Sequence, residues 1–101
     1  MERIERADAE EWAAWFRALA DPTRLQVLNA IAAQGGALTI GELVERVEIG
    51  QSTVSHHVRV LADAGFIIHA RQGTSSSVTV NRSCLSALPD AARAVLGTST
   101  A

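Results

Sequence analysis

The sequence predicts a mainly α-helical domain that carries one small β-hairpin. Apolar residues recur at helical spacing through the first half of the chain, and helix-capping residues precede several of these stretches. After Gly65 the residues become β-prone and then alternate between polar and apolar, as is typical of strands. With 101 residues, 48% apolar and 20% charged, we expect one globular domain over residues 1–101.

The first helix is predicted over about residues 9–19, with Asp8 as its N-cap. Apolar residues form one stripe on it, at positions i, i+3, i+4 and i+7: Trp12, Trp15, Phe16 and Leu19. Asp21 and Pro22 then end this helix and start a second one, because aspartate caps a helix and proline suits its first position. The second helix is expected to reach about residue 33 and to point three residues inward: Leu25, Leu28 and Ile31.

A third helix is predicted from Thr39, where Glu42 three residues later completes a capping box. It ends near Val47, and residues 48–50 form a tight turn into a fourth helix over about residues 51–64. A short helix, a turn with glycine and a second helix make a helix-turn-helix unit.

A hairpin over about residues 66–80 follows the helix-turn-helix unit of about residues 39–64 and would form a wing beside it. A last helix is predicted over about residues 83–96, where Pro89 interrupts or restarts it. The predicted fold class is therefore a winged helix-turn-helix.

The outward face of the fourth helix is rich in side chains that form hydrogen bonds. Helical geometry turns Val54, Val58 and Leu61 inward and leaves a polar set outside: Gln51, Ser52, Thr53, Ser55, His56 and Arg59. Side chains of these types bind base edges in the major groove of DNA. The alternative is an ordinary solvated face on a small helical bundle, and the adjacent wing with Arg71 near its tip favours DNA.

The neighbouring His56 and His57 do not indicate an enzyme or a standard metal site. Adjacent residues point about 100° apart on a helix, and a helical metal pair needs i, i+4 spacing. Ser55 and His57 do not face each other, and the chain has no G-x-S-x-G motif. We expect His56 to face DNA and His57 to face the protein interior.

Charge and cysteine content indicate the environment of the protein. The net charge is −2, yet residues 49–82 contain Arg59, Arg71 and Arg82 against Asp63 alone, which is a local positive face. One cysteine, no apolar stretch long enough for a membrane span and no signal peptide favour a cytoplasmic location.

Three segments resemble the ArsR/SmtB family of small bacterial winged-helix repressors: ALADPTRLQVLNAI (18–31), TIGELVERVEIGQSTVSHHVRVLADAGFI (39–67) and ARQGTSSSVTVN (70–81). The resemblance implies a homodimer that binds an operator palindrome in double-stranded DNA. It implies DNA contacts by the six outward residues of the fourth helix and by the wing residues Arg71, Gln72 and Thr74. It also implies a dimer interface between the first and last helices, built from Trp12, Trp15, Phe16, Leu19, Leu85, Leu88 and Val95.

The sequence departs from this family in its expected sensing residues. The segment ELVERV (42–47) lacks the thiol pair of the third helix, and the last helix has no histidine. His69 and Cys84 remain as candidate ligands for nickel or zinc, since imidazole binds both ions. The default interpretations are a surface histidine and a small buried cysteine.

The leading hypothesis is a homodimeric, sequence-specific DNA-binding transcriptional regulator, a repressor whose signal is open: a metal at a non-standard site is one candidate, and a thiol event at Cys84 and a partner protein are the others. The alternative is a winged-helix adaptor for protein interactions, or a regulator controlled by a partner protein or by a thiol.

Overall fold

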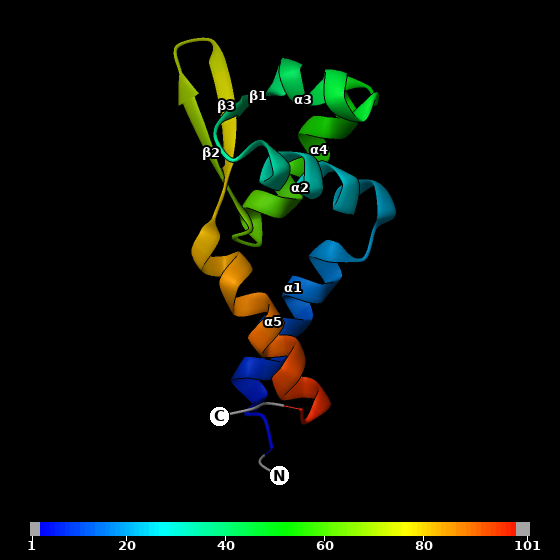
Figure 1. Ribbon diagram of the computed structural model, residues 1–101, viewed down its shortest axis with the longest axis vertical. Helices are drawn as coiled ribbons and strands as arrows, with labels where there is room; N and C mark the ends of the chain where they lie inside the picture. The colour runs from blue at the N-terminus through cyan, green and yellow to red at the C-terminus, as the bar shows by residue number, and fades with distance from the viewer. Residues whose placement is uncertain (1–2, 99–101) are drawn as a thin grey trace.

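The computed structural model describes residues 3–98 and gives the protein an elongated shape, with extents of 49 × 21 × 21 Å (Figure 1). The elements follow in the order α1 (Arg6–Leu19), α2 (Pro22–Gln34), β1 (Leu38–Thr39), α3 (Ile40–Val47), α4 (Gln51–Asp63), β2 (Ile67–Gln72), β3 (Ser75–Val80) and α5 (Arg82–Leu96). The predicted mainly helical fold with a hairpin wing is confirmed.

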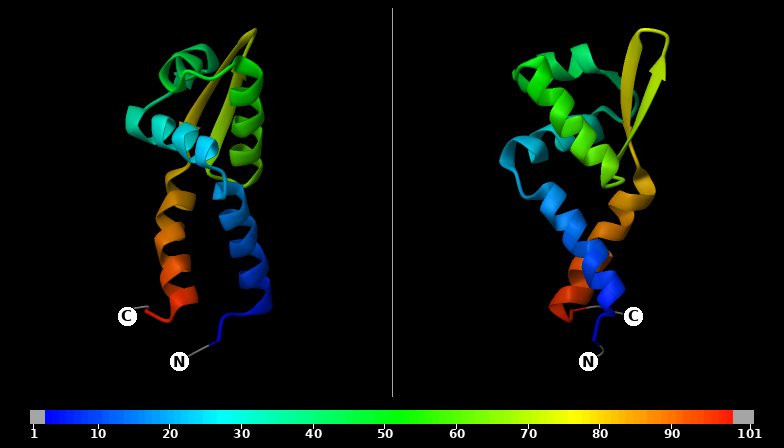
Figure 2. Two further views of the ribbon diagram at one scale, coloured as in Figure 1. Left: turned by 90° about the vertical axis from the view of Figure 1, so that its right-hand side faces the viewer. Right: turned by 180° about the vertical axis from the view of Figure 1, so that it is seen from behind.

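The molecule has two regions. The head, residues 21–80, contains α2, α3, α4 and the strands, whereas the stem consists of α1 and α5. Both stem helices extend from the same end of the head, so the outer ends of α1 and α5 lie far from the wing (Figures 1 and 2). None of the helices within residues 3–98 is both long and apolar enough to cross a membrane.

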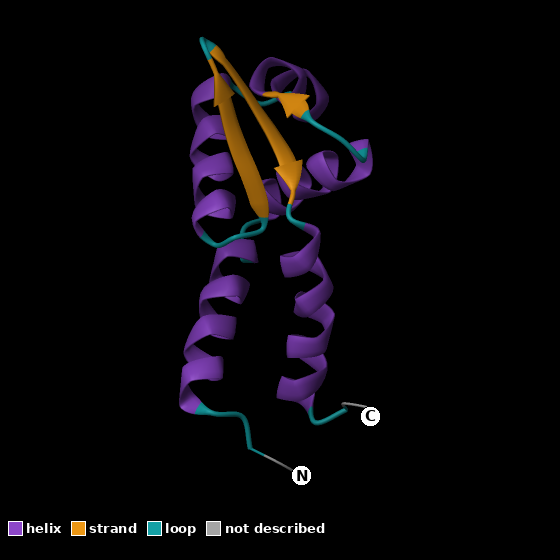
Figure 3. Cartoon of the chain, turned by 90° about the vertical axis from the view of Figure 1, so that its left-hand side faces the viewer, coloured by secondary structure: helices purple, strands orange, loops and turns teal. Residues whose placement is uncertain are grey.

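The strands form one antiparallel sheet in the order β1-β3-β2, and the hairpin of β2 and β3 projects as a long wing (Figure 3). Its register pairs Ile67 with Val80 at the base and Gln72 with Ser75 at the tip. The two-residue loop between them begins at Gly73, whose φ of 60° suits a tight hairpin turn. The two-residue strand β1 was not predicted, because it is too short to show a period and exists only by pairing with β3.

The core lies between the helices of the head and the inner face of the sheet. Its largest fully buried side chains come from α2, β1, α3, α4 and β3 and from the link between α4 and β2: Val27, Ile31, Leu38, Leu43, Val54, Val58, Leu61, Phe66 and Val78. Because these residues bury the helix-turn-helix unit on one side, its opposite side is left free for function.

Two details of the first helices differ from the sequence prediction. The first helix begins at Arg6 rather than near residue 9, so Asp8 lies in its first turn, where an acid still favours the helix dipole. In α2 the predicted cap holds, since the Arg24 N–H donates to Asp21 Oδ1 at 3.0 Å. The prediction that Leu25 points inward is wrong: Leu25 is 48% exposed and Val27 is fully buried in its place.

The last helix is continuous. It begins at Arg82 and includes Pro89, which therefore neither ends nor restarts it. A proline inside a helix removes one backbone hydrogen bond, so α5 is weaker at this point than its length suggests.

Candidate nucleic-acid interface

The start of α3 and the turn after it orient α4. The Thr39 N–H donates to Glu42 Oε1 at 2.9 Å, and the Glu42 N–H donates to Thr39 Oγ1 at 3.1 Å, which confirms the capping box. The hydrogen bond from the Thr39 backbone lowers the pKa of Glu42. After α3, Glu48 adopts the left-handed region with φ of 55°, and its N–H donates to the Val44 carbonyl at 2.9 Å. These local bonds fix the bend between α3 and α4.

The two faces of α4 differ as predicted. Val54, Val58 and Leu61 are at most 1% exposed and pack in the core. The outward residues are all exposed: Gln51, Ser52, Thr53, Ser55, His56 and Arg59. The helix therefore presents an uninterrupted polar surface that carries hydrogen-bond donors and acceptors.

The two adjacent histidines of α4 lie in different environments. His56 is exposed, whereas His57 is 6% exposed and its Nδ1 atom has no hydrogen-bond partner. Burial lowers the pKa of His57, and the charge of Arg24 at the start of α2 lowers it further. His57 is therefore held neutral against α2 and belongs to the packing of α4.

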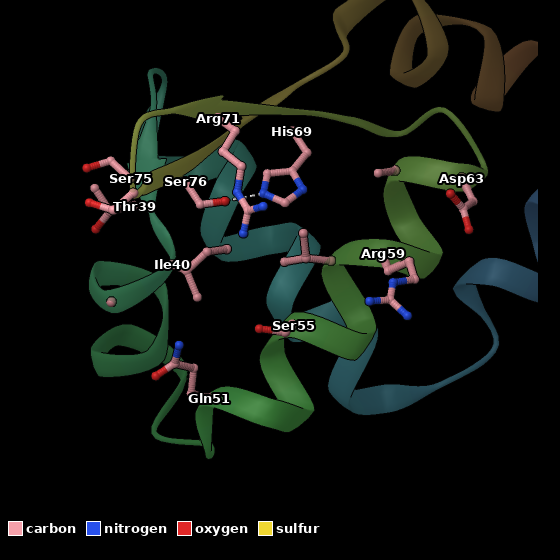
Figure 4. A pocket seen from close by; sticks show the side chains of 14 residues that line it. Thr39, Ile40, Gln51, Ser55, Arg59, Asp63, His69, Arg71, Ser75 and Ser76 are labelled. Atoms are coloured by element: carbon pink, nitrogen blue, oxygen red, sulfur yellow. Dashed lines mark hydrogen bonds between the residues drawn. The ribbon is translucent and has the colours of Figure 1, made fainter.

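A groove of about 600 Å³ separates α4 from the wing (Figure 4). One wall is the outward side of α4, with Gln51, Ser55, Arg59 and Asp63. The other wall is the hairpin, with His69, Arg71, Thr74, Ser75 and Ser76, and the start of α3 closes one end with Thr39 and Ile40. His69 Nε2 and Ser76 Oγ form a hydrogen bond across the two strands.

The groove is positively charged. Arg59 and Arg71 approach it from opposite walls, and Asp63 is the acidic residue among those that line it. Ion pairs among residues 3–98 join Arg6 to Glu10 and Arg93 to Asp90, both in the stem, so neither groove arginine is neutralised by such a pair within this range. Unpaired guanidinium groups next to hydroxyl groups suit the binding of phosphate and of base edges.

The nine residues predicted to contact DNA come from α4 and from the tip of the wing. Five line the groove: Gln51, Ser55, Arg59, Arg71 and Thr74. Ser52, Thr53 and His56 lie exposed on α4, and the side chain of Gln72 is outside the described part of the structure. The sequence interpretation did not include Thr39, His69, Ser75 or Ser76 in this set. Strand alternation was the available signal, because His69 and Arg71 are two residues apart in β2 and therefore share one face of the hairpin.

The seven residues predicted at a dimer interface fall into two groups. Four of them pack against the core of the head: Trp15, Leu19, Leu85 and Leu88. Trp15 meets the ring of Phe66 edge-on, with centroids 6.4 Å apart. Trp12 is half-buried, whereas Phe16 and Val95 are 39% and 50% exposed, and Ile4 and Leu96 add further exposed apolar surface to the stem.

The candidate metal ligands, His69 and Cys84, lie in different elements. His69 lies in β2, and Cys84 lies in the first turn of α5, half-buried beside Gly65. Burial raises the pKa of the Cys84 thiol, and the charge of Glu11 adds to this effect. Within residues 3–98, no three His, Cys, Asp or Glu side chains are grouped closely enough to hold a metal ion.

Comparison with known proteins gives matches in sequence and in structure. A model of a helix-turn-helix domain matches residues 19–70. The transcriptional repressor SdpR of Bacillus subtilis is 33% identical over 69% of this chain and 76% of its own length. These matches include the whole of α3, the turn and α4.

Solved structures resemble the whole chain. A crystal structure of an ArsR family transcriptional regulator covers 100% of both chains with a TM-score of 0.72 and 26% identity. The homodimeric winged helix-turn-helix DNA-binding domain of Mb0332 from Mycobacterium bovis covers 96% of this chain and 90% of its own, with a TM-score of 0.72 and 21% identity. The second likeness shows the shared fold.

Proposed function

The chain belongs to the ArsR/SmtB family of winged helix-turn-helix transcriptional regulators, and we propose that it acts as a homodimeric repressor that binds an operator palindrome. As a member of this family it is a DNA-binding regulator and not an enzyme. The sequence specificity, the homodimer and the residues that contact DNA are the proposed part.

The observation that carries the proposal is the continuous polar surface formed by α4 and the wing. The major groove of DNA is about 12 Å wide and accepts one α-helix, whose N-terminal half contacts the base edges. In this docking Gln51, Ser52 and Ser55 face base edges, and Arg59 and Arg71 face phosphates of the DNA strand that runs between α4 and the wing. The exposed ends of these side chains and the positive groove between the two elements support it.

The exposed apolar residues of the stem support the homodimer. Phe16 and Val95 present large apolar side chains at a region where the head offers no cover. A second copy would bury them and set two α4 helices in the same symmetric assembly. Two half-sites about one helical turn of DNA apart would match that symmetry.

The signal that releases DNA has a separate test. The metal-responsive interpretation rests on His69 and Cys84. An ion bound by either residue would need further ligands, because no three His, Cys, Asp or Glu side chains within residues 3–98 are grouped closely enough to hold it. Calorimetric titration of nickel or zinc into the wild type, His69→Ala and Cys84→Ser tests it. Metal binding that both variants lose would support this signal, and no heat of binding in the wild type would remove it.

The test of the DNA-binding surface begins with duplexes selected by the protein from a random pool, whose affinity is then measured at several salt concentrations. We expect selective binding that weakens as salt rises, because phosphate contacts release counterions. Arg59→Ala should weaken binding by about 1–3 kcal/mol and flatten the salt dependence by about one phosphate contact.

Arg6→Ala is the matched control. Its side chain is 88% exposed at the far end of the stem, so loss of the same charge there should leave affinity almost unchanged. An Arg59→Ala variant that binds as tightly as Arg6→Ala would remove α4 from the proposed interface. A wild type that shows no salt-sensitive, selective binding would contradict the proposed function and favour an adaptor for proteins.

A further inference from the structure

The groove between α4 and the wing has a defined place in the proposed docking, and the inference here rests on that function. When a helix occupies the major groove and a wing lies at the adjacent minor groove, one sugar–phosphate backbone separates the two. That backbone must pass through the space between α4 and the hairpin. The groove of about 600 Å³ at this position is the space available for it.

The side chains that meet in this groove suit phosphate. Arg59 comes from α4, and His69 and Arg71 come from β2, so cationic or protonatable groups face one another across it (Figure 4). Ser55 on α4 and Ser76 on β3 add hydroxyl groups to the lining of the groove (Figure 4). Charged N–H donors form the strongest hydrogen bonds to phosphate oxygens.

His69 is held in place by the neighbouring strand. In the register, His69 pairs with Val78 and Arg71 pairs with Ser76, so Ser76 lies diagonally across from His69 on the same face. The hydrogen bond between His69 Nε2 and Ser76 Oγ uses one ring nitrogen. The other nitrogen, Nδ1, then remains for a ligand in the groove.

We propose that His69 is a phosphate-binding residue of the DNA interface and that Ser76 positions it. A protonated imidazole has two N–H donors, one for Ser76 Oγ and one for a phosphate oxygen. The charged groups that face it are Arg71 on its own strand and Arg59 and Asp63 on α4. A phosphate bound in the groove favours a positive charge on His69. DNA binding therefore takes up a proton at His69.

The consequence is an affinity for DNA that depends on pH near neutrality, where histidine changes its charge. As the pH falls from 8 to 6.5, wild-type affinity should rise by about three- to tenfold, the size of one charge-assisted contact at an exposed site. The salt dependence should steepen by about one contact over the same range.

The experiment measures the affinity for a selected duplex at pH 8 and 6.5, each at several salt concentrations, for the wild type and His69→Gln. Glutamine keeps a hydrogen-bonding side chain of similar reach without a titratable charge. Whatever its affinity at pH 8, His69→Gln should lose most of the rise in affinity between pH 8 and pH 6.5. A purely structural role would lower affinity equally at both values.

Three further variants define the source of the effect. His56→Gln measures the share of the rise that belongs to the other exposed histidine on α4. Ser76→Ala should reduce the rise, and Ser76→Thr, which keeps the hydroxyl group, should restore it. Circular dichroism checks that each variant folds, which the exposure of His69 favours.

The outcomes separate the inference from the proposed function. If the wild type binds selectively and His69→Gln shows the same pH profile, the inference is overturned and the proposed function stands. If the wild type shows no salt-sensitive, selective binding at either pH, the proposed function itself fails.

Discussion

The head and the stem of this molecule differ in how completely they bury their apolar residues. In the head, Leu43, Leu61 and Phe66 are fully buried, and each helix of the helix-turn-helix unit contributes to one core. In the stem, the buried residues are the small Ala18 and Ala91, whereas Phe16, Val95 and Leu96 are 39–73% exposed. The head therefore has the buried core of an independent domain. The stem has an exposed apolar surface of the kind that marks a protein–protein contact.

The largest expected change is a loss of stability when a core side chain of the head is removed. Leu61→Ala should lower the free energy of unfolding by about 2–5 kcal/mol, because the cavity cannot be filled by neighbours that are themselves buried. Urea denaturation followed by circular dichroism measures it. Leu25→Ala is the matched control, since Leu25 is 48% exposed, and it should change stability by less than about 0.5 kcal/mol. Equal losses in the two variants would mean that Leu25 is covered in solution.

The next effect should come from placing a charge on the apolar side of the stem. Phe16→Glu should weaken dimerisation by about 2–4 kcal/mol, because an unpaired carboxylate would be buried between the two copies. Sedimentation velocity over a range of concentrations measures this change. The head should stay folded in the variant. A dimer of unchanged strength would place the interface elsewhere on the molecule.

A smaller effect concerns the pH dependence of the head. Because burial lowers the pKa of His57, the folded state keeps this side chain neutral below its ordinary value of 6.5, while the unfolded chain takes up a proton. Stability should therefore be fully present above about pH 6.5 and should fall as the pH drops below it. Asp21 and Glu42 act in the same sense, because their pKa values are also lowered, but their stabilisation is lost only at pH values below their ordinary values of 3.8 and 4.5.

The measurement compares denaturation at pH 7.5 and 5.5 for the wild type and His57→Gln. The variant should lose less stability on acidification than the wild type does. If both proteins lose the same amount, another group is responsible and His57 is not the buried neutral residue of α4.

Local signals predicted much of the fold. The capping box of Thr39 and Glu42, the cap at Asp21 and the two faces of α4 depend on neighbours within one or two turns, so the sequence contains them. The inward side of α2 could not be predicted as well, because α1, α3, α4 and β3 all pack on this helix and leave no single apolar stripe. Strand β1 depends on the register of β3, which only the folded chain defines.

The candidate site also contains features that local sequence predicts and features that depend on how distant elements pack. The outward residues of α4 could be named from helical geometry, because one element contains all of them. Strand alternation places His69 on the same face as Arg71, but the positions of His69 and Ser76 relative to α4 depend on how the hairpin lies against that helix. Some of the predicted dimer residues pack against the head and others stay exposed. Periodicity identifies an apolar stripe on a helix, but it does not show which part of the stripe the head covers.

In the proposed function, the head contacts DNA while the stem joins two copies. Hydrogen exchange tests this division most directly, when it is followed by mass spectrometry with and without a selected DNA duplex. The first amides of α4, which have no helical partner, and the amides of the wing should exchange more slowly when DNA is added. Those of α1 and α5 should slow with protein concentration and should not respond to DNA. Protection by DNA in the stem, with α4 and the wing unchanged, would contradict this division.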